Sequence, residues 1–431
     1  MTGAVTVKAG LLSAVATGST RHAWFTPWDI DRPASGSPLR SYHLARDVAR
    51  TAGMAVYSPI EHLAAGSPYL PLGGQIDLRR HPRGRYGRLR ALVILNPGTR
   101  AATGPVLTAT CRSLARTWSR DGDHWLVCES AYIAAPLVRL ARATGARLVY
   151  SSHNCESDVW RQIVTGAGSL AARAGAELAW RAIRRHELAL LRTAAATWCC
   201  SDLDASLLAA LDPASAARTI VVPNGVNAEV VALQAPAASE PATIGFIGYL
   251  GTDLVHQGCL FLIDEVMPRV RARLPAARLI LAGRDPRPEL RLRAGADVEI
   301  ISPLDNPNDV LRRCRLSVVP LLQGGGTRLK ILESLAAGRP VVSTPKGAEG
   351  LDLGRLAGVT VAEGAAAFAD AVVGEASLPL EAARAEQLRG MVLARHDWQT
   401  ITSRLLDTMV ARFGDPWRPA GGSPPHAATR G

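Results

Sequence analysis

The sequence has few of the features that mark metalloproteins, secreted proteins or membrane-spanning proteins. Its seven cysteines are scattered, none forms a C-x-x-C pair, and no cysteine and histidine cluster has the spacing of a zinc site. No apolar run is long enough for a spanning helix. The first twenty residues, rich in glycine, serine and threonine, do not resemble a signal peptide. We therefore expect a cytoplasmic protein with reduced thiols and no metal, and leave peripheral contact with the inner face of the membrane open.

Lysine is also scarce, although the chain is basic. Only Lys8, Lys330 and Lys346 are lysines among 49 basic residues, and the 37 acidic residues leave a net charge of +12. Such an excess suits nucleic acid, an anionic membrane or phosphorylated substrates, but an arginine-rich and alanine-rich skew also follows from GC-rich coding. The most basic cluster, Arg79–Arg90, has one tyrosine, too few aromatics for base stacking. We expect no nucleic-acid partner.

Strand-like and helix-like segments alternate along the chain. A composition of 48% hydrophobic and 20% charged residues is globular, and 431 residues exceed what one core usually supports. Alternation of this kind predicts an α/β protein with parallel sheets covered on both faces. The expected strands are Ala23–Thr26, Leu92–Leu95, Trp125–Cys128, Arg147–Tyr150, Ile220–Val222, Thr243–Ile247, Arg278–Ala282, Val298–Ile301, Leu316–Pro320 and Pro340–Ser343.

A turn and a linker divide these strands into two sets. The segment VPNGVN is a turn signal, and the stretch that follows is rich in alanine and proline without periodicity. We predict an N-terminal Rossmann-like domain over residues 1–223, a linker at 224–241 and a C-terminal Rossmann-like domain over 242–396. A helix at 397–413 is expected to pack back toward the N-terminal domain, ahead of a disordered tail at 414–431. Ligands of such sheets bind at the carboxyl ends of the strands, in a central cleft.

The segment after the strand Leu316–Pro320 is the most informative. Three glycines, Gly324 to Gly326, precede Thr327, a good N-cap for a helix that runs to about Ala337. Exposed amides and a helix N-terminus form an anion cradle. On this helix Ile331, Leu332, Leu335 and Ala336 share one face, with Lys330 and Glu333 on the other. Arg328 and Lys330 suit a diphosphate, and Glu333 suits the two hydroxyls of a ribose.

This segment, GGGTRLKILESLAAGRPVVSTPKGAEGL, resembles the donor site of retaining GT-B glycosyltransferases, the nucleotide-sugar group often called family 4. The resemblance extends to FTPWDIDRPASGSPLRSYHLARDVA, to VYSSHNCESDVWRQ and to VVPNGVN, in the order of that fold. It implies two doubly wound Rossmann-like domains that face a central cleft. It also implies metal-independent transfer from a nucleoside diphosphate sugar, with retention at the anomeric carbon and no cofactor.

The resemblance also implies roles for residues of the C-terminal half. Positions matching Arg328 and Lys330 contact the donor diphosphate, the position of Glu333 binds the ribose, and Gly325, Gly326 and Thr327 bring backbone groups to the donor. Two departures from the family pattern stand out. The first glutamate of Glu-x7-Glu is Gly325 here, and Tyr249 and Gln257 replace two cations of the family. The donor sugar is therefore open, and Arg328 and Lys330 are the main diphosphate clamp.

Three residues of the N-terminal half are expected in the same cleft. His153 follows the strand Arg147–Tyr150 and matches a histidine near the reacting carbon, which orients donor or acceptor. Gly36 and Arg40 match positions on the acceptor side. Glu156 matches a glutamate that either serves the site or fixes the loop. We take His153, Arg328 and Lys330 as the catalytic set. No pair of carboxylates of the kind that a double-displacement glycosidase uses is evident.

The sequence leaves the base, the sugar, the acceptor, the pathway and the oligomeric state open. The acceptor is a saccharide, a lipid-linked molecule or a small molecule. One alternative function is a sugar-nucleotide epimerase or hydrolase with the same fold. Another is a basic protein that binds membrane or nucleic acid. The stretch Leu170–Arg192 carries Arg173, Arg181, Arg184 and Arg185 beside leucine and tryptophan. We interpret it as an amphipathic helix that covers a sheet, with an interfacial anchor as the alternative.

Overall fold

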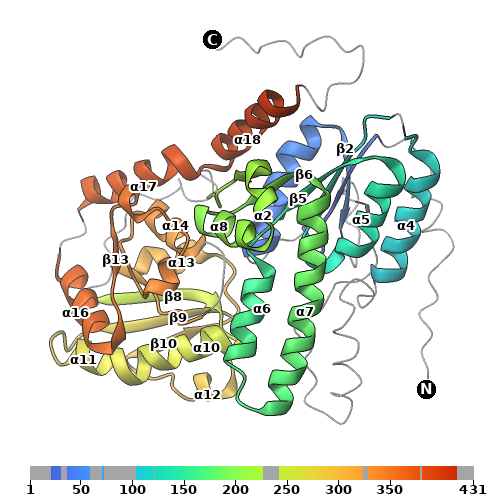
Figure 1. Ribbon diagram of the computed structural model, residues 1–431. Coiled ribbons are helices and arrows are strands. Elements are labelled where there is room, and N and C mark those ends of the chain that lie inside the picture. Colours follow the sequence, from blue (N-terminus) through green and yellow to red (C-terminus); the bar gives the residue numbers. More distant parts are fainter. Residues whose placement is uncertain are drawn as a thin grey trace, which may run out of the picture.

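The structure is a computed structural model of the full chain (Figure 1). It describes residues 21–30, 36–58, 70–71, 103–120, 122–226, 242–323, 329–378 and 381–414. Of the sequence predictions, the strand Leu92–Leu95, the basic cluster Arg79–Arg90, and Gly325, Gly326, Thr327 and Arg328 lie outside these residues. So do residues 1–20, residues 227–241 of the linker and residues 415–431 of the tail.

The N-terminal half contains a seven-stranded parallel sheet with the order β3-β2-β1-β4-β5-β6-β7. This order is that of a doubly wound dinucleotide-binding fold, extended by one strand. Strands β1, β4 and β6 are buried over almost their whole length, as expected when helices cover both faces of a parallel sheet. The strands are β1 (His22–Phe25), β2 (Met54–Ser58), β3 (Leu70–Pro71), β4 (Trp125–Glu129), β5 (Arg147–Ser151), β6 (Ala194–Cys199) and β7 (Thr219–Val221).

Helices cover this sheet on two sides and bury two apolar clusters. Leu114, Leu137 and Ile183 belong to one cluster, and Leu44 and Val48 belong to the other. The helices of this half are α2 (Gly36–Leu44), continued by the π-helical turn Ala45–Ala49, α4 (Thr103–Thr117), α5 (Ala134–Thr144), α6 (Glu156–Thr165), α7 (Leu170–Thr193) and α8 (Asp202–Leu211). Helices α6 and α7 form a long hairpin along one side of the domain (Figure 1).

The C-terminal half repeats the architecture with six strands in the order β10-β9-β8-β11-β12-β13. Each pair in this sheet is parallel, and one large cluster of buried aliphatic side chains lies against it. The strands are β8 (Thr243–Tyr249), β9 (Arg278–Arg284), β10 (Val298–Ile301), β11 (Leu316–Val319), β12 (Val341–Ser343) and β13 (Val359–Val361). The helices are α10 (Asp253–Leu260), with a π-helical turn to Val266, α11 (Met267–Arg271), α12 (Pro288–Arg291), α13 (Pro307–Arg313), α14 (Leu329–Ala336), α15 (Pro345–Ala348), α16 (Gly364–Ser377), α17 (Ala382–His396) and α18 (Trp398–Phe413).

Two doubly wound α/β halves confirm the predicted fold class. The sequence analysis missed β2, β3, β6 and β13. Strand β13 is a half-exposed edge strand of three residues, so it has no apolar run from which to predict it.

The chain passes between the halves at two adjacent places. Val226 forms a parallel bridge with Asp397: its amide donates to the carbonyl of His396 at 2.7 Å, and its carbonyl accepts from the amide of Trp398 at 3.3 Å. From there α18 runs along the N-terminal half (Figure 1). Trp398, its first residue, stacks on His43 with ring centroids 4.9 Å apart. Ile401, Leu405 and Met409 complete this packing within the cluster that contains Trp24 and Trp125.

None of the helices among the described residues is long and apolar enough to cross a bilayer.

Candidate functional site

The two halves approach each other at the amino ends of α2 and α14. A Cβ atom on Gly36 would lie 3.3 Å from Cδ1 of Leu329, so the two helix starts face each other closely. A pocket of about 220 Å³ lies between the halves, lined by Cys155, Asp158, Ser201 and Asp204 on one side and by Glu349 with Gly350 on the other. Groups from both sheets therefore meet where the sequence predicts the cleft.

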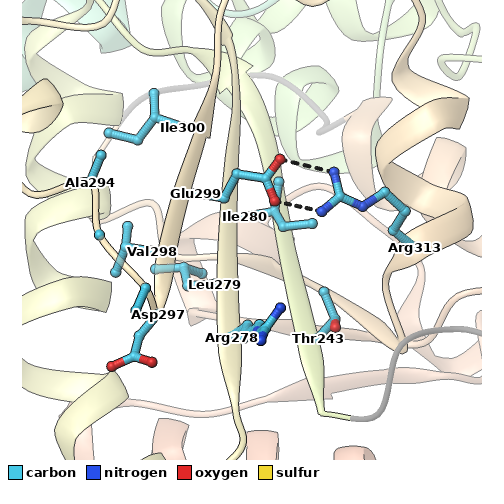
Figure 2. A pocket seen from close by; sticks show the side chains of 12 residues that line it. Thr243, Arg278, Leu279, Ile280, Ala294, Asp297, Val298, Glu299, Ile300 and Arg313 are labelled. Carbon is cyan, nitrogen blue, oxygen red and sulfur yellow. Dashed lines mark hydrogen bonds and ion pairs between the residues drawn. The ribbon is translucent and has the colours of Figure 1, made fainter.

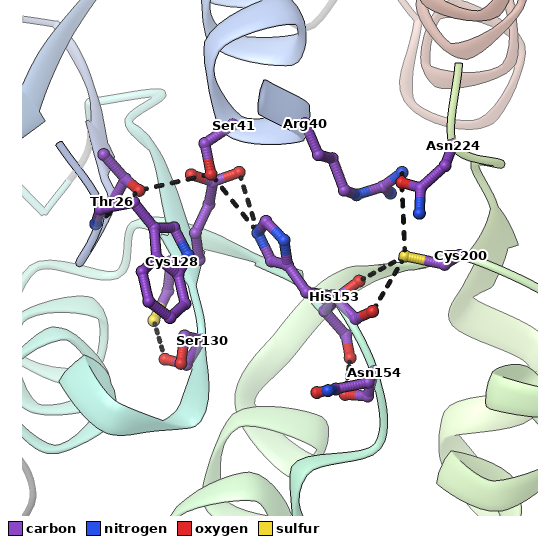
Figure 3. A network of polar contacts seen from close by, with 12 residues as sticks. Thr26, Arg40, Ser41, Cys128, Ser130, His153, Asn154, Cys200 and Asn224 are labelled. Carbon is purple, nitrogen blue, oxygen red and sulfur yellow. Dashed lines mark hydrogen bonds and ion pairs between the residues drawn. The ribbon is translucent and has the colours of Figure 1, made fainter. Parts of the chain in front are cut away.

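His153 lies at the carboxyl end of β5 within a buried polar network (Figure 3). The residue is 8% exposed, and its Nε2 lies 3.5 Å from Oγ of Ser41 and 3.6 Å from a carboxylate oxygen of Glu129. Thr26 extends the network, since its hydroxyl lies 3.5 Å from that of Ser41. The indole of Trp28 meets the imidazole edge-on, with ring centroids 6.2 Å apart. The histidine ring is thus held on several sides.

Glu129 is a site residue that the sequence analysis missed. It ends β4, is fully buried and faces His153. Burial alone would raise the pKa of Glu129, but the His153 ring and the hydroxyls of Ser41 and Thr26 outweigh it and leave the pKa below its ordinary value. The group is therefore a carboxylate that can fix the orientation of the imidazole. Its only sequence signal is an acidic residue just beyond the predicted strand Trp125–Cys128.

Arg40 lies on α2 and is 1% exposed. One guanidinium nitrogen, Nη1, donates to the carbonyl of Pro223 at 3.2 Å and to Oδ1 of Asn224 at 3.0 Å (Figure 3). The Nε and Nη2 atoms are buried and have no hydrogen-bond partner among the described residues. The structure thus places Arg40 against the segment that leads out of the N-terminal half, with two donors left for an anion.

In the C-terminal half, Lys330 and Glu333 lie on α14, the helix that follows β11 in the chain. The predicted apolar face is correct, because Ile331, Leu332, Leu335 and Ala336 are all buried. The same four residues anchor the helix on the sheet. Burial raises the pKa of Glu333, and the Lys330 ammonium opposes the shift, so the two side chains lie within electrostatic reach of each other.

Lys330 is positioned by the strand next to it. Its ammonium lies 4.6 Å from the centre of the Phe246 ring on β8, which fits a cation–π contact. A Cβ atom on Gly248 would lie 3.1 Å from Nζ of Lys330, so any side chain at this position would crowd the ammonium. The sequence analysis noted Gly248 only as part of a weak glycine pattern.

The segment between β11 and the glycines is held by two hydroxyls at the end of β12. Thr344 donates to the carbonyl of Leu321 at 2.5 Å and accepts from the amide of Gly347 at 2.9 Å. Ser343 donates to the carbonyl of Val319 at 3.3 Å. These contacts fix where the chain leaves the sheet toward the glycine segment. Neither residue was singled out in the sequence.

Glu156 begins α6, and its structure favours the loop-fixing role. Its neighbour Glu187 on α7 accepts hydrogen bonds from the amides of Glu156 and Ser157 at 3.0 and 2.9 Å, and from the hydroxyl of Tyr150 at 2.9 Å. Burial, together with the charge of Glu187, raises the pKa of Glu156 to about 8. The pair therefore holds a proton on Glu156 while Glu187 caps the helix that follows His153.

A further cavity of about 370 Å³ lies at the opposite end of the C-terminal sheet (Figure 2). Thr243, Arg278 and Val298, the first residues of β8, β9 and β10, line it beside the ion pair of Glu299 with Arg313. Because it opens at the amino ends of the strands, it is separate from His153 and Lys330. Among the described residues, no three histidine, cysteine or acidic side chains gather as a metal site requires.

Comparison with solved structures identifies the fold of the two facing domains. The two facing sheets are the GT-B fold. The chain is similar to sucrose-phosphate synthase from Thermosynechococcus elongatus, with TM-score 0.64 and 16% identity over 91% of this chain and 98% of the other. It is also similar to Anabaena Alr3699/HepE, in complex with UDP and glucose, with TM-score 0.60 and 14% identity over 91% of this chain and 100% of the other. A trehalose 6-phosphate synthase from Burkholderia multivorans gives TM-score 0.61 and 14% identity over 91% and 98%.

Within this fold, residues 241–374 match the family described as Glycosyl transferases group 1. The match covers all six strands of the C-terminal sheet and helix α14, on which Lys330 and Glu333 lie. No curated protein sequence matches the chain.

Proposed function

We propose that the protein is a glycosyltransferase that moves a sugar from a nucleoside diphosphate sugar to an acceptor hydroxyl, with retention of the anomeric configuration. The observation that carries the proposal is the position of Lys330, at the start of a helix that faces Gly36 across the domain boundary. The family match of the C-terminal half supports it. Anabaena HepE, which shares the fold, is known in complex with UDP and with UDP-glucose.

The donor diphosphate is assigned to Lys330 together with Arg328, Gly325, Gly326 and Thr327, and the ribose to Glu333. Charge grows on the diphosphate as its bond to the sugar breaks, so a fixed ammonium stabilises the transition state more than the ground state. The ammonium lies over the phenyl ring of Phe246 and beside Gly248, where a side chain would crowd it.

The acceptor is assigned to the opposite side, at His153, Gly36 and Arg40. Glu129 and Ser41 hold the imidazole of His153, so it can orient a sugar hydroxyl with little loss of freedom. The two unpartnered nitrogens of Arg40 are suited to an anionic group that approaches α2. The acceptor class, whether saccharide, lipid-linked or small molecule, is not specified by these contacts.

Retention needs the acceptor to attack from the face that the diphosphate leaves. In this scheme the departing phosphate takes the proton of the acceptor hydroxyl, so no enzymic nucleophile is required. The carboxylates near His153 fit this view, because each already has a partner. Glu129 faces the imidazole, and Glu187 caps the amino end of α6. We also propose that no metal and no further cofactor take part, and that the protein is cytoplasmic.

Titration calorimetry of the full chain with UDP and with GDP tests the donor assignment. We expect one nucleotide to bind, and Glu333→Ala to weaken that binding by roughly 10-fold or more, since a hydrogen-bonded charged group is lost. Binding of neither nucleotide, to wild type at millimolar concentration, would contradict the proposal.

Nuclear magnetic resonance of the product tests the reaction. An α-linked donor should give an α-linked product, and chelators should leave the rate unchanged. Consumption of the donor without any acceptor would instead indicate the epimerase or hydrolase alternative. An inverted product would contradict the retaining mechanism.

A further inference from the structure

Helix α7 has an outward face that the described part of the protein leaves uncovered. Residues on its inner side are buried against the domain, among them Ala179, Ile183 and Leu190. The exposed residues recur at helical spacing on the other side, which gives one continuous stripe about 36 Å long. From the tip of the α6–α7 hairpin upward, this stripe consists of Leu170, Arg173, Ala174, Leu178, Arg181, Arg184, Arg185 and Arg192.

A groove between α7 and α5 runs beside the stripe and has a volume of about 540 Å³. Every charged residue that lines it is an arginine. Its lining consists of Arg142, Arg181, Arg184, Arg185, Arg192, Trp180, Leu188 and Ala189. Guanidinium groups bind phosphate oxygens in a planar, two-pronged manner, so the chemistry of this groove suits phosphate.

Few carboxylates offset these charges. Arg181 pairs with Glu177 at 3.0 Å, and Arg192 lies 3.8 Å from Asp212. Within the described ranges, Arg184 and Arg185 have no carboxylate at ion-pair distance. Like charges so close on one helix repel and lower the stability of the fold. An anionic partner would remove that repulsion.

The stripe also exposes large apolar side chains near the hairpin tip. Leu170 is 87% exposed, Leu178 is 43% exposed, and Ile163 on the neighbouring α6 is 46% exposed. A soluble polyanion has no apolar region that these side chains could contact. Leucine and tryptophan interleaved with arginine along one face is the pattern of a helix that lies in a membrane interface.

We propose that the outward face of α7 docks on a bilayer of anionic phospholipid, with headgroup phosphates in the arginine groove and the tip leucines among the acyl chains. The surface lies outside the candidate active site, so the proposal does not rest on the proposed function.

Vesicle flotation of the full chain at low salt tests this proposal. We expect binding to vesicles of phosphatidylcholine with phosphatidylglycerol, and little binding to phosphatidylcholine alone. The triple variant Arg181→Glu, Arg184→Glu and Arg185→Glu should bind at least about 100-fold less, because each basic residue contributes about 1 kcal/mol at an anionic surface.

A matched control carries the same change of net charge on helices other than α7. Arg269→Glu, Arg395→Glu and Arg404→Glu alter three exposed arginines of α11, α17 and α18, and should change binding less than about threefold if docking is local. An equal loss in both triple variants would overturn the proposal in favour of general charge attraction. Unchanged binding of the α7 variant would overturn it outright.

A second variant separates the bilayer from a soluble polyanion. Leu170→Ser with Leu178→Ser should weaken vesicle binding severalfold while leaving binding to heparin unchanged. If the leucine variant binds vesicles like wild type, and heparin displaces the protein from them, the site serves a free polyanion and the bilayer proposal fails. Nucleotide titration of every variant reports on the donor site separately, so failure of docking and failure of the proposed function remain distinguishable.

Discussion

At the scale of single residues, the ammonium of Lys330 is the sharpest test of the donor site. Lys330→Ala should lower kcat by roughly 100-fold or more, because the group acts on charge that develops in the transition state. The midpoint of thermal unfolding should fall only slightly, since the side chain is half-buried and contacts Phe246 at one end. Initial-rate kinetics with a thermal melt measures both.

The matched control for this lysine is Lys346→Ala, which removes an ammonium paired with Glu349. It should change kcat severalfold at most. Equal turnover in Lys330→Ala and wild type would remove Lys330 from the catalytic set.

Glu129 allows a second test, of positioning rather than chemistry. Glu129→Gln keeps the shape of the side chain but removes the charge that faces Nε2 of His153. We expect kcat to fall about 10-fold or more, with nucleotide affinity unchanged, because the residue touches neither phosphate nor ribose in the proposed arrangement. A purely structural role would instead lower the free energy of unfolding and leave kcat of the folded enzyme unchanged.

At the scale of elements, most of the strands and the buried face of α14 could be predicted from the sequence. Apolar runs and helical spacing act locally, so a single chain is enough to find them. Glu129 was not found, because its importance arises from the sheet order β1-β4-β5, which brings Ser41, His153 and Glu129 together from distant positions. The capping of α6 by Glu187 was hidden for the same reason, since the two elements meet only through the hairpin.

The amino end of α6 gives a prediction about pH. The pKa of Glu156 lies near 8 in the folded protein, against about 4.5 when the carboxyl is exposed to water. Between these values the folded state holds a proton that the unfolded state releases, so the free energy of unfolding falls as pH rises from about 4.5 to about 8. Above pH 8 this contribution is constant.

Glu156→Gln should remove that slope, because the amide mimics the protonated carboxyl and does not titrate. Urea denaturation at several pH values measures it: the variant should gain stability relative to wild type between pH 6 and pH 8. A difference that stays constant with pH would show that Glu156 carries no proton in the folded state.

At the scale of the whole molecule, the contact of α18 with the N-terminal half should respond to acid. Burial is the main cause that lowers the pKa of His43 to about 4, and the ring is neutral where it stacks on Trp398. The unfolded state takes up a proton near pH 6.5, so stability due to this group is present above that pH and is lost as pH falls toward 4.

His43→Phe keeps an aromatic ring against Trp398 and removes the titration. Its unfolding free energy should fall less than that of wild type between pH 6.5 and pH 4, by up to about 3 kcal/mol. The comparison isolates His43 from His22, whose pKa is also lowered to about 4 and which titrates in both proteins. Parallel pH curves for the two proteins would contradict the assignment.

The double crossing of the chain also determines how the protein can be divided. The helix that completes the core of the N-terminal half lies at the end of the C-terminal half, so a fragment ending at Val226 would lack Trp398, Ile401, Leu405 and Met409. Neither half is a self-sufficient building block that recombination could exchange by itself. A successful chimera would have to take α18 from the parent that supplies the N-terminal sheet, and two separate fragments should recover a folded protein only by reassembling through that helix.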